Sequence, residues 1–525
     1  MKVKGVDRRD GDQQDGDRPD GYPAADRQRA VLERVLAESR VFLDGLATRP
    51  VSARADVDEV AAALGGPLPA DGTDPLAVID ALVRGAEPGV VAMPSPRFFG
   101  WVIGGVLPAA LGADWLTSLW DQNAGLLVSS PAAAGAERVA GGWLLDLLGL
   151  PASSAVGYVT GGMMANFTCL AAARDAVLRR VGWDVAVDGL LGCPPVRVLV
   201  GRERHDTIDL SLRLLGLGAG RAVQVDVDEQ GRMLPAALAA ALDDGPAGAA
   251  TIVCLQAGNV HSGAYDPFGD CIDLAHRSGA WVHVDGAFGL WAAASPALRP
   301  LLAGAERADS WATDAHKTLN VPYDNGIAIV ADAAALHAAM GIEAAYLIKD
   351  ARPDPMDAVP EFSRRARGFT VWAALRSLGR DGVAAMVEGL AARARRFAEQ
   401  LSDVDGVEVV NDVVFTQVCV RLGSAEVTRE VARRLLADGT AWMTPSTWHG
   451  QTVLRISVSN HRTNDADVDA SVAALVRILD DVRSGTARTP SSRPTGLPDR
   501  SGPDSRPGAA DAGDPQSPGS YAGVE

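Results

Sequence analysis

Between residues 100 and 330, short runs of apolar, β-prone residues alternate with helical stretches, and this alternation constrains the fold more than any other feature of the chain. Continuous apolar strands separated by helices are typical of a mostly parallel sheet that helices cover on both faces. We therefore expect functional side chains at the carboxyl ends of the strands. The strand-like runs are VGYVT, VRVLV, AVQVDV, ATIVCLQ, AWVHVD and GIAIV, and the helical stretches include ANFTCLAAARDAVLRRVG and LPAALAAALDD.

The rest of the chain divides around this α/β region, which we place in a large domain at residues 100–375. Strands with partly polar faces (VEVV, VVFTQVCVR and TVLRISV) and helices near 384–401, 425–437 and 465–483 predict a smaller α+β domain at residues 376–483. Residues 28–99 are expected to form an N-terminal helical segment, because apolar residues from Leu32 to Leu46 follow helical spacing.

Both ends of the chain differ from this pattern. Residues 1–27 and 484–525 are rich in Asp, Arg, Gly, Pro and Ser and have almost nothing to bury, so we expect two disordered tails. The N-terminus lacks the apolar core of a signal peptide, and no stretch reaches the roughly 18 apolar residues of a membrane span.

The composition indicates which partners the chain can have. With 525 residues, of which 47% are hydrophobic, it can bury a large core. A formal net charge of −17 argues against general affinity for nucleic acid or anionic membrane, since phosphate binding needs clustered Lys and Arg. The five scattered cysteines suit reduced thiols. We expect a cytoplasmic protein with a small-molecule partner.

Three local motifs carry chemistry. In VGYVTGGMMANF, a strand, Gly161 and Gly162, and a helix start follow in the order that suits an anion at a helix N-terminus. In AWVHVDGAFG, an apolar strand ends at Asp285; His283 shares its face, but no third ligand supports a metal, so no metal is expected. In TDAHKTLNVPYDNG, Lys317 lies between strand-like runs. LGLGAG at 215–220 follows a helix and precedes a strand, so we expect a helix-terminating turn there.

Taken together, these motifs match the needs of one cofactor. An anion cradle, a strand-end acid and a lysine are what pyridoxal 5'-phosphate requires as phosphate anchor, ring-nitrogen partner and Schiff-base amine.

Several segments resemble the pyridoxal-phosphate-dependent group II amino-acid decarboxylases, which include aromatic amino-acid, tyrosine and glutamate decarboxylases. These segments are PRFFGW, QAGNVHSGAYDP, HVDGAFG, DAHKTLNVPYDNG and SRRARGFTVWAALRSLG, and the resemblance covers roughly residues 30 to 482. It implies a fold type I (PLP-dependent transferase-like) large domain with a mostly parallel sheet of the seven-stranded type, a smaller α+β domain, an amino-acid substrate and a homodimer.

The resemblance also assigns roles to residues around the cofactor ring. Lys317 matches the lysine that forms the internal aldimine, and Asp285 matches the carboxylate at the pyridine nitrogen. Ala287 matches the small residue under the ring, and His205 matches the histidine stacked on its other face. Tyr346, in EAAYLIKDARPDP, matches the tyrosine acid that a mobile loop carries over the site.

Residues around the phosphate depart from the family pattern. Met163 and Met164 stand where relatives often carry a hydroxyl and an acid, and Asn259 stands where many have threonine. Phosphate binding would then depend on backbone amides, on Thr160 and on residues near His316. The predicted cofactor contacts are Thr160, Gly161, Gly162, Met163, His205, Asn259, Asp285, Ala287, Asp314, His316 and Lys317.

The substrate is expected to be an aromatic L-amino acid. Phe98, Phe99 and Trp101 match the segment that lines the side-chain pocket in aromatic decarboxylases, and Trp120 is a further candidate wall. An acidic substrate would need a positioned cation, and only the SRRAR run at 363–367 suggests one. Two alternatives stay open: an aminotransferase or another Cα lyase on the same fold, and a non-catalytic scaffold that binds cofactor poorly.

Overall fold

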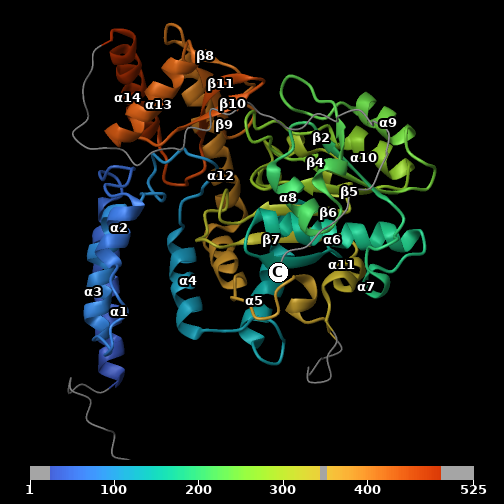
Figure 1. Ribbon diagram of the computed structural model, residues 1–525, viewed down its shortest axis with the longest axis horizontal. Coiled ribbons are helices and arrows are strands. Elements are labelled where there is room, and N and C mark those ends of the chain that lie inside the picture. The colour runs from blue at the N-terminus through green and yellow to red at the C-terminus, as the bar shows by residue number, and fades with distance from the viewer. Residues whose placement is uncertain (1–23, 343–351, 486–525) are drawn as a thin grey trace, which may run out of the picture.

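A seven-stranded sheet forms the centre of the computed structural model, which describes residues 24–342 and 352–485 (Figure 1). Its strand order is β1-β7-β6-β5-β4-β2-β3, and β7 alone of the seven runs antiparallel to its neighbours. The predicted, mostly parallel sheet is therefore confirmed. The strands are β1 (Ala155–Val159), β2 (Val196–Gly201), β3 (Val223–Val225), β4 (Ala250–Gln256), β5 (Trp281–Asp285), β6 (Ser310–Asp314) and β7 (Gly326–Val330).

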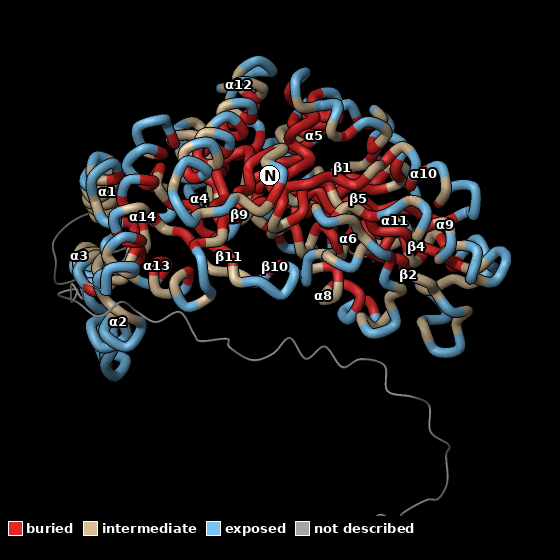
Figure 2. The backbone as a smooth tube through the Cα atoms, turned by 90° about the horizontal axis from the view of Figure 1, so that it is seen from above, coloured by how far each residue is buried: buried red, intermediate tan, exposed pale blue. Residues whose placement is uncertain are grey.

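Helices bury both faces of this large sheet, which explains why its strands are continuously apolar. In β4, Val253 and Leu255 join one core cluster, while Ile252 and Cys254 join the other. The first cluster includes α5 (Pro131–Leu148), α9 (Pro235–Asp243), α10 (Phe268–Arg277) and the first turns of α12 (Gly368–Ser402); the second includes α6 (Gly162–Arg180), α8 (Asp206–Leu214) and α11 (Ala333–Met340). Figure 2 shows the resulting buried layer. A short helix, α7 (Val185–Asp188), follows α6.

A four-stranded antiparallel sheet forms a second, smaller unit, with the order β10-β11-β9-β8. The later turns of α12 pack on it together with α13 and α14. The predicted helices near 425–437 and 465–483 and three of these four strands are confirmed; β10 was not predicted. The elements are β8 (Glu408–Val409), β9 (Gln417–Arg421), α13 (Ala425–Asp438), β10 (Thr444–Trp448), β11 (Gln451–Ser457) and α14 (Asp465–Arg483).

Helix α12 crosses the predicted domain boundary at residues 375/376, and its backbone changes direction at Gly379, where φ is +63°. It therefore belongs to both units, and the boundaries proposed from the sequence stay a prediction.

Three N-terminal helices lie along one side of the molecule, next to α4 (Pro108–Trp120) (Figure 1). They are α1 (Ala24–Gly45), α2 (Val57–Leu64) and α3 (Pro75–Ala86). The first confirms the helix predicted from apolar spacing. Leu36 of α1 and Leu82 of α3 are 40% and 50% exposed, so part of their apolar surface is uncovered in a single chain. No helix in residues 24–342 and 352–485 is both long and apolar enough to span a bilayer.

The sheet topology brings the motifs to one edge. Since parallel strands end on the same side, Asp285 at the end of β5 and Asp314 at the end of β6 lie close together, with Asp285 opposite Ala312 in the strand register. LGLGAG ends α8 as predicted: Leu215 follows the helix, and Gly216 and Gly218 have φ of +72° and +76°.

Candidate active site

The carboxyl edge of the large sheet borders a cavity of about 910 Å³, a size that is ordinary for small-molecule sites. Both units build it, because the β10–β11 hairpin of the small sheet contributes Ser446 to Trp448. Seven residues predicted from the sequence line this cavity: Trp101, Gly162, Met163, His205, Asp285, Ala287 and Lys317.

Lys317 follows β6 and is held by an ion pair. Its Nζ atom lies 2.7 Å from Oδ2 of Asp314, whose side chain is only 1% exposed. A buried carboxylate is costly unless it is paired, so Asp314 holds the ammonium group at the end of β6. The chain has four lysines (Lys2, Lys4, Lys317 and Lys349), and Lys317 is the one that lies within the described residues.

Asp285 is oriented by a chain of buried polar groups. Its Oδ2 accepts a hydrogen bond from Asn166 Nδ2 (3.2 Å), and its Oδ1 accepts one from the backbone N–H of Ala287 (3.2 Å). Asn166 Oδ1 lies 2.9 Å from Nε2 of His283, whose Nδ1 lies 3.0 Å from Ser310 Oγ. His283 therefore orients Asp285 through Asn166. No group of three potential metal ligands occurs in the described parts of the chain.

His205 caps the N-terminus of α8 and lines the cavity. Its Nδ1 accepts a hydrogen bond from the backbone N–H of Thr207 (3.2 Å), so the neutral ring carries its proton on Nε2. Burial lowers the pKa of His205 more than the neighbouring Asp285 raises it. The structure thus places a neutral imidazole with a free N–H at the cavity.

The predicted phosphate end lies where β1 meets α6. A Cβ on Gly162 would come within 2.5 Å of Asp314 Oδ2, and one on Gly161 would come within 3.2 Å of the His316 ring. Only glycine lets the start of α6 approach these side chains, and its first N–H groups favour an anion. Met163 lines the cavity, whereas Thr160 is not among the residues that line it.

The Asn259 side chain stabilises a turn. Its Oδ1 accepts hydrogen bonds from the backbone N–H groups of His261 (2.8 Å) and Ser262 (3.2 Å), and its Nδ2 donates to Glu203 (3.2 Å). Because these bonds use both ends of the amide, and because Asn259 does not line the cavity, the side chain is not placed for the predicted cofactor contact.

The predicted aromatic walls separate in space. Trp101 lines the cavity, but Phe98 stacks on Trp442 (5.4 Å between centroids) and Phe99 packs edge-on against Phe397 (4.9 Å). Both phenylalanines are fully buried, because the segment passes between the cavity and the core of the small unit.

Two further predicted residues lie outside this cavity as the single chain forms it. Trp120 is 48% exposed and packs edge-on against Phe369. Within the described residues, Phe98, Phe99 and Trp120 are therefore not cavity walls. Tyr346 lies outside the described residues, and its predicted role stays a prediction.

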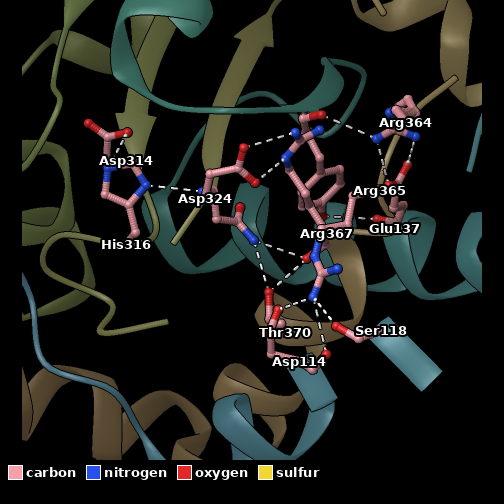
Figure 3. Close-up of polar contacts among 12 residues, drawn as sticks. Asp114, Ser118, Glu137, Asp314, His316, Asp324, Arg364, Arg365, Arg367 and Thr370 are labelled. Carbon is pink, nitrogen blue, oxygen red and sulfur yellow. Dashed lines mark hydrogen bonds and ion pairs between the residues drawn. The ribbon is translucent and has the colours of Figure 1, made fainter. Parts of the chain in front are cut away.

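The arginines of the SRRAR run are already paired with acids (Figure 3). Arg364 binds Glu137 (2.6 Å) in a buried pair. Arg365 binds Asp114 (2.7 Å), and Arg367 binds Asp324 (3.0 Å). None of the three lines the cavity, so this run does not supply the cation that an acidic substrate would need.

Arg455 in β11 is the cation that sequence reasoning missed. It lines the cavity and is 8% exposed, and its Nε atom has no hydrogen-bond partner in the described structure. Its Nη1 atom donates a hydrogen bond to Val260 O (3.4 Å), and no carboxylate pairs with it in residues 24–342 and 352–485. Burial lowers the pKa of its guanidinium group. A lone arginine inside the apolar run TVLRISV was the signal that could have identified it, since unpaired buried charges are rare.

Comparison with known proteins agrees with this geometry. Residues 67–423 match the family model described as "Pyridoxal-dependent decarboxylase conserved domain". Tryptophan decarboxylase 1 from Oryza sativa subsp. japonica is 31% identical over 405 residues, which cover 71% of this chain and 78% of that protein. Cysteine sulfinic acid decarboxylase from Mus musculus is 28% identical over 332 residues (62% and 66%). A crystal structure of Oryza sativa TDC with PLP and tryptamine superposes with a TM-score of 0.82 at 26% identity, covering 88% of this chain and 99% of that one.

Replacing Lys317 with Ala should abolish the visible absorption band that a lysine-bound aldehyde cofactor gives, because no other described residue supplies an amine. Turnover should fall by about 1,000-fold or more. Absorption spectra of purified protein with added pyridoxal phosphate check this. Lys349→Ala is the matched control and should keep the band; a band that survives in Lys317→Ala contradicts the assignment.

Acid should destabilise the fold, because several histidines are buried as neutral rings. Burial lowers the pKa of His261 and His283 to about 3 and that of His461 to about 4, against an ordinary value of 6.5. Below pH 6.5 these histidines bind more protons in the unfolded chain than in the folded chain. Their contribution to the free energy of unfolding is therefore fully present above pH 6.5 and is lost as the pH falls toward the pKa values of the folded protein.

Each of these histidines should add up to about 1.4 kcal/mol per pH unit to the fall in unfolding free energy. The midpoint of thermal unfolding should therefore drop steadily from pH 7 to pH 5, and His283→Asn should make that drop shallower. A midpoint that stays level or rises as the pH falls would disprove the explanation.

Proposed function

Because this chain belongs to the pyridoxal-dependent decarboxylase family, we propose that it converts an aromatic L-amino acid into the amine and CO₂. Family membership favours decarboxylation over the aminotransferase and scaffold alternatives. The relatives, however, act on both kinds of substrate, since one is named for tryptophan and another for cysteine sulfinic acid. The choice between aromatic and acidic substrates rests on the cavity.

The residues of the site fit pyridoxal 5'-phosphate, which when bound supplies a ring that accepts the electron pair of the breaking Cα–carboxylate bond. The cavity reaches Gly162 and Met163 at the start of α6, where backbone N–H groups would bind the phosphate. Lys317 would bind the cofactor aldehyde, Asp285 would keep the pyridine nitrogen protonated, and His205 and Ala287 would contact the cofactor ring. Tyr346 would protonate Cα.

The observation that carries the aromatic proposal is the charge balance around the cavity. Lys317 is paired with Asp314, Arg204 is paired with Asp209 through two bonds of 2.6 and 2.9 Å, and Arg202 is paired with Asp226. Arg455 is the one arginine or lysine of the described lining without an acid partner.

A decarboxylase substrate always brings an α-carboxylate, so Arg455 would be used by that group. No unpaired arginine or lysine is then left, among the described residues, for a second acid on the side chain. The flat rings of Trp101, Phe288 and Trp448 line the same cavity and suit an indole or phenol.

A substrate panel tests the proposal. Purified protein with pyridoxal phosphate is given L-tryptophan, L-tyrosine, L-phenylalanine, L-glutamate, L-aspartate and L-cysteine sulfinic acid, and CO₂, amine and keto acid are measured. We expect kcat/KM for the best aromatic substrate to exceed that for any acidic one by at least about tenfold, because an unpaired buried charge costs more than 1.4 kcal/mol. A preference for an acidic substrate, or keto acid as the main product, would contradict it.

Variants of Arg455 test whether this residue binds the α-carboxylate of the substrate. Arg455→Met should lower kcat/KM about 100-fold through loss of charge-assisted hydrogen bonds, and Arg455→Lys should restore part of it. Arg396, which pairs with Asp469 on the surface, provides the control: Arg396→Met should leave kcat/KM within twofold.

We also propose that two copies of the chain associate through the N-terminal helices and α4. Their exposed large apolar residues are Leu32, Leu36, Val41, Val57, Leu64, Val78, Leu82, Trp115, Leu116, Leu119 and Trp120. Uncovered apolar surface of this extent is typical of an interface, and a second copy is the partner that the family resemblance implies.

Light scattering after size-exclusion chromatography should give twice the mass of one chain at micromolar concentration. The double change Leu36→Glu and Leu82→Glu should give a single-chain mass, because it buries two charges in the interface. A wild-type protein with the mass of one chain would rule out the dimer.

A further inference from the structure

The β10–β11 hairpin of the small sheet reaches the cavity with a defined register. Trp448 pairs with Gln451, and the two residues between them, His449 and Gly450, have φ of +49° and +72°. Two successive positive φ values are those of a type I′ turn, whose twist matches that of the flanking strands. The turn therefore fixes which residues of the hairpin share a face.

One face of this hairpin carries both Arg455 and Trp448. Arg455 pairs with Thr444, so their side chains lie on the same side, and alternation along β10 puts Ser446 and Trp448 on that side too. Trp448 is the fourth residue after Thr444 along the strand, which corresponds to about 13 Å. Since both Arg455 and Trp448 line the cavity, a substrate whose carboxylate lies at Arg455 would extend its side chain toward Trp448.

The Trp448 ring is held on two sides. Its Nε1–H donates a hydrogen bond to Glu203 Oε2 (3.0 Å). Its ring stacks on that of His261 with centroids 6.0 Å apart and planes 9° apart, and His261 Nε2 lies 2.9 Å from Ser446 Oγ. The indole is thus a fixed wall of the cavity, held in one orientation.

Glu203 connects three separate segments. It lies in the turn between β2 and α8, two residues before His205, and also accepts hydrogen bonds from Asn259 Nδ2 (3.2 Å) and His449 Nε2 (2.5 Å). A Cβ on Gly231 would come within 2.5 Å of both Glu203 and Asn259, so a glycine is needed beside them. Both carboxylate oxygens are occupied, which makes Glu203 a support for other side chains and leaves no free acceptor for a substrate.

We infer that Trp448 is a specificity-determining wall for the substrate side chain and that Glu203 is the residue that positions it. The inference rests on the proposed function, because it assigns the far end of the cavity to the aromatic side chain. It adds that the cavity discriminates between two-ring and one-ring side chains through this indole. Removing the indole should weaken binding of the larger side chain more than that of the smaller one, because the larger one reaches the wall.

Spectral titration of the protein loaded with pyridoxal phosphate tests the inference, since adding an amino acid changes the cofactor absorption whichever Cα bond later breaks. Dissociation constants for L-tryptophan and L-phenylalanine are measured for wild type, Trp448→Phe and Trp448→Ala. We expect Trp448→Ala to weaken L-tryptophan binding at least tenfold and L-phenylalanine binding less than threefold, with Trp448→Phe in between. The ratio of the L-tryptophan to the L-phenylalanine dissociation constant is then compared among the proteins. If this ratio stays within twofold of the wild-type value in both variants, the inference is overturned.

Variants of Glu203 test the positioning role. Glu203→Ala should change the same ratio at least threefold, and Glu203→Gln should restore it, because the amide oxygen still accepts the indole N–H. If Glu203→Ala lowers the thermal midpoint but leaves the ratio unchanged, Glu203 is structural only and its positioning role is refuted.

Matched controls and the wild-type result separate this inference from the proposed function. Trp183 donates its indole N–H to Gly189 O (2.8 Å) away from the cavity, so Trp183→Phe should leave the ratio unchanged, as should Glu229→Gln on the surface. Wild-type protein that binds aromatic acids without forming amine would contradict only the proposed reaction. If no aromatic amino acid changes the spectrum of the wild-type protein, both the inference and the proposed function are overturned.

Discussion

Two buried carboxylates at adjacent strand ends are the constraint on which the rest of the site depends. Asp285 and Asp314 end neighbouring parallel strands, and like charges in a low-dielectric edge are stable only if each has its own compensation. Asp314 forms an ion pair with the ammonium group of Lys317, and Asp285 accepts hydrogen bonds from Asn166 and from a backbone N–H. In the function that we propose, the two acids have different roles: Asp314 holds the amine that would bind the cofactor, and Asp285 would bind the protonated ring nitrogen.

The two sheets supply different residues to the cavity. The large sheet supplies the lysine, the acids and the glycine turn, which we assign to the cofactor. The small sheet supplies Arg455 and Trp448 from one face of a hairpin, which we assign to the substrate. Glu203 connects the two units near His205, so the contacts that orient Trp448 also hold the turn that carries His205.

Continuous apolar runs were enough to predict the large sheet, and the needs of the cofactor together with the family resemblance selected Asp285 and Lys317, which line one cavity. Strand β6, SWATD, was missed because its polar residues hide a fully buried strand, and β10, TPSTW, was missed because a proline interrupts it. Phe98 and Phe99 were assigned to the pocket because they match a family segment that lines it, and the sequence does not reveal that both side chains enter the core instead. Arg455 was missed although it stands alone in an apolar run, because the sequence does not show that this side chain lacks an acid partner in the fold.

The proposed reaction requires a covalent bond between the cofactor aldehyde and the amine of Lys317. Borohydride reduction of the loaded protein, followed by peptide mass spectrometry, would locate that bond. We expect the phosphopyridoxyl group on the peptide that contains Lys317 and on no peptide from Lys2, Lys4 or Lys349. A phosphopyridoxyl group on one of those three lysines, or on none of the four, would contradict the account.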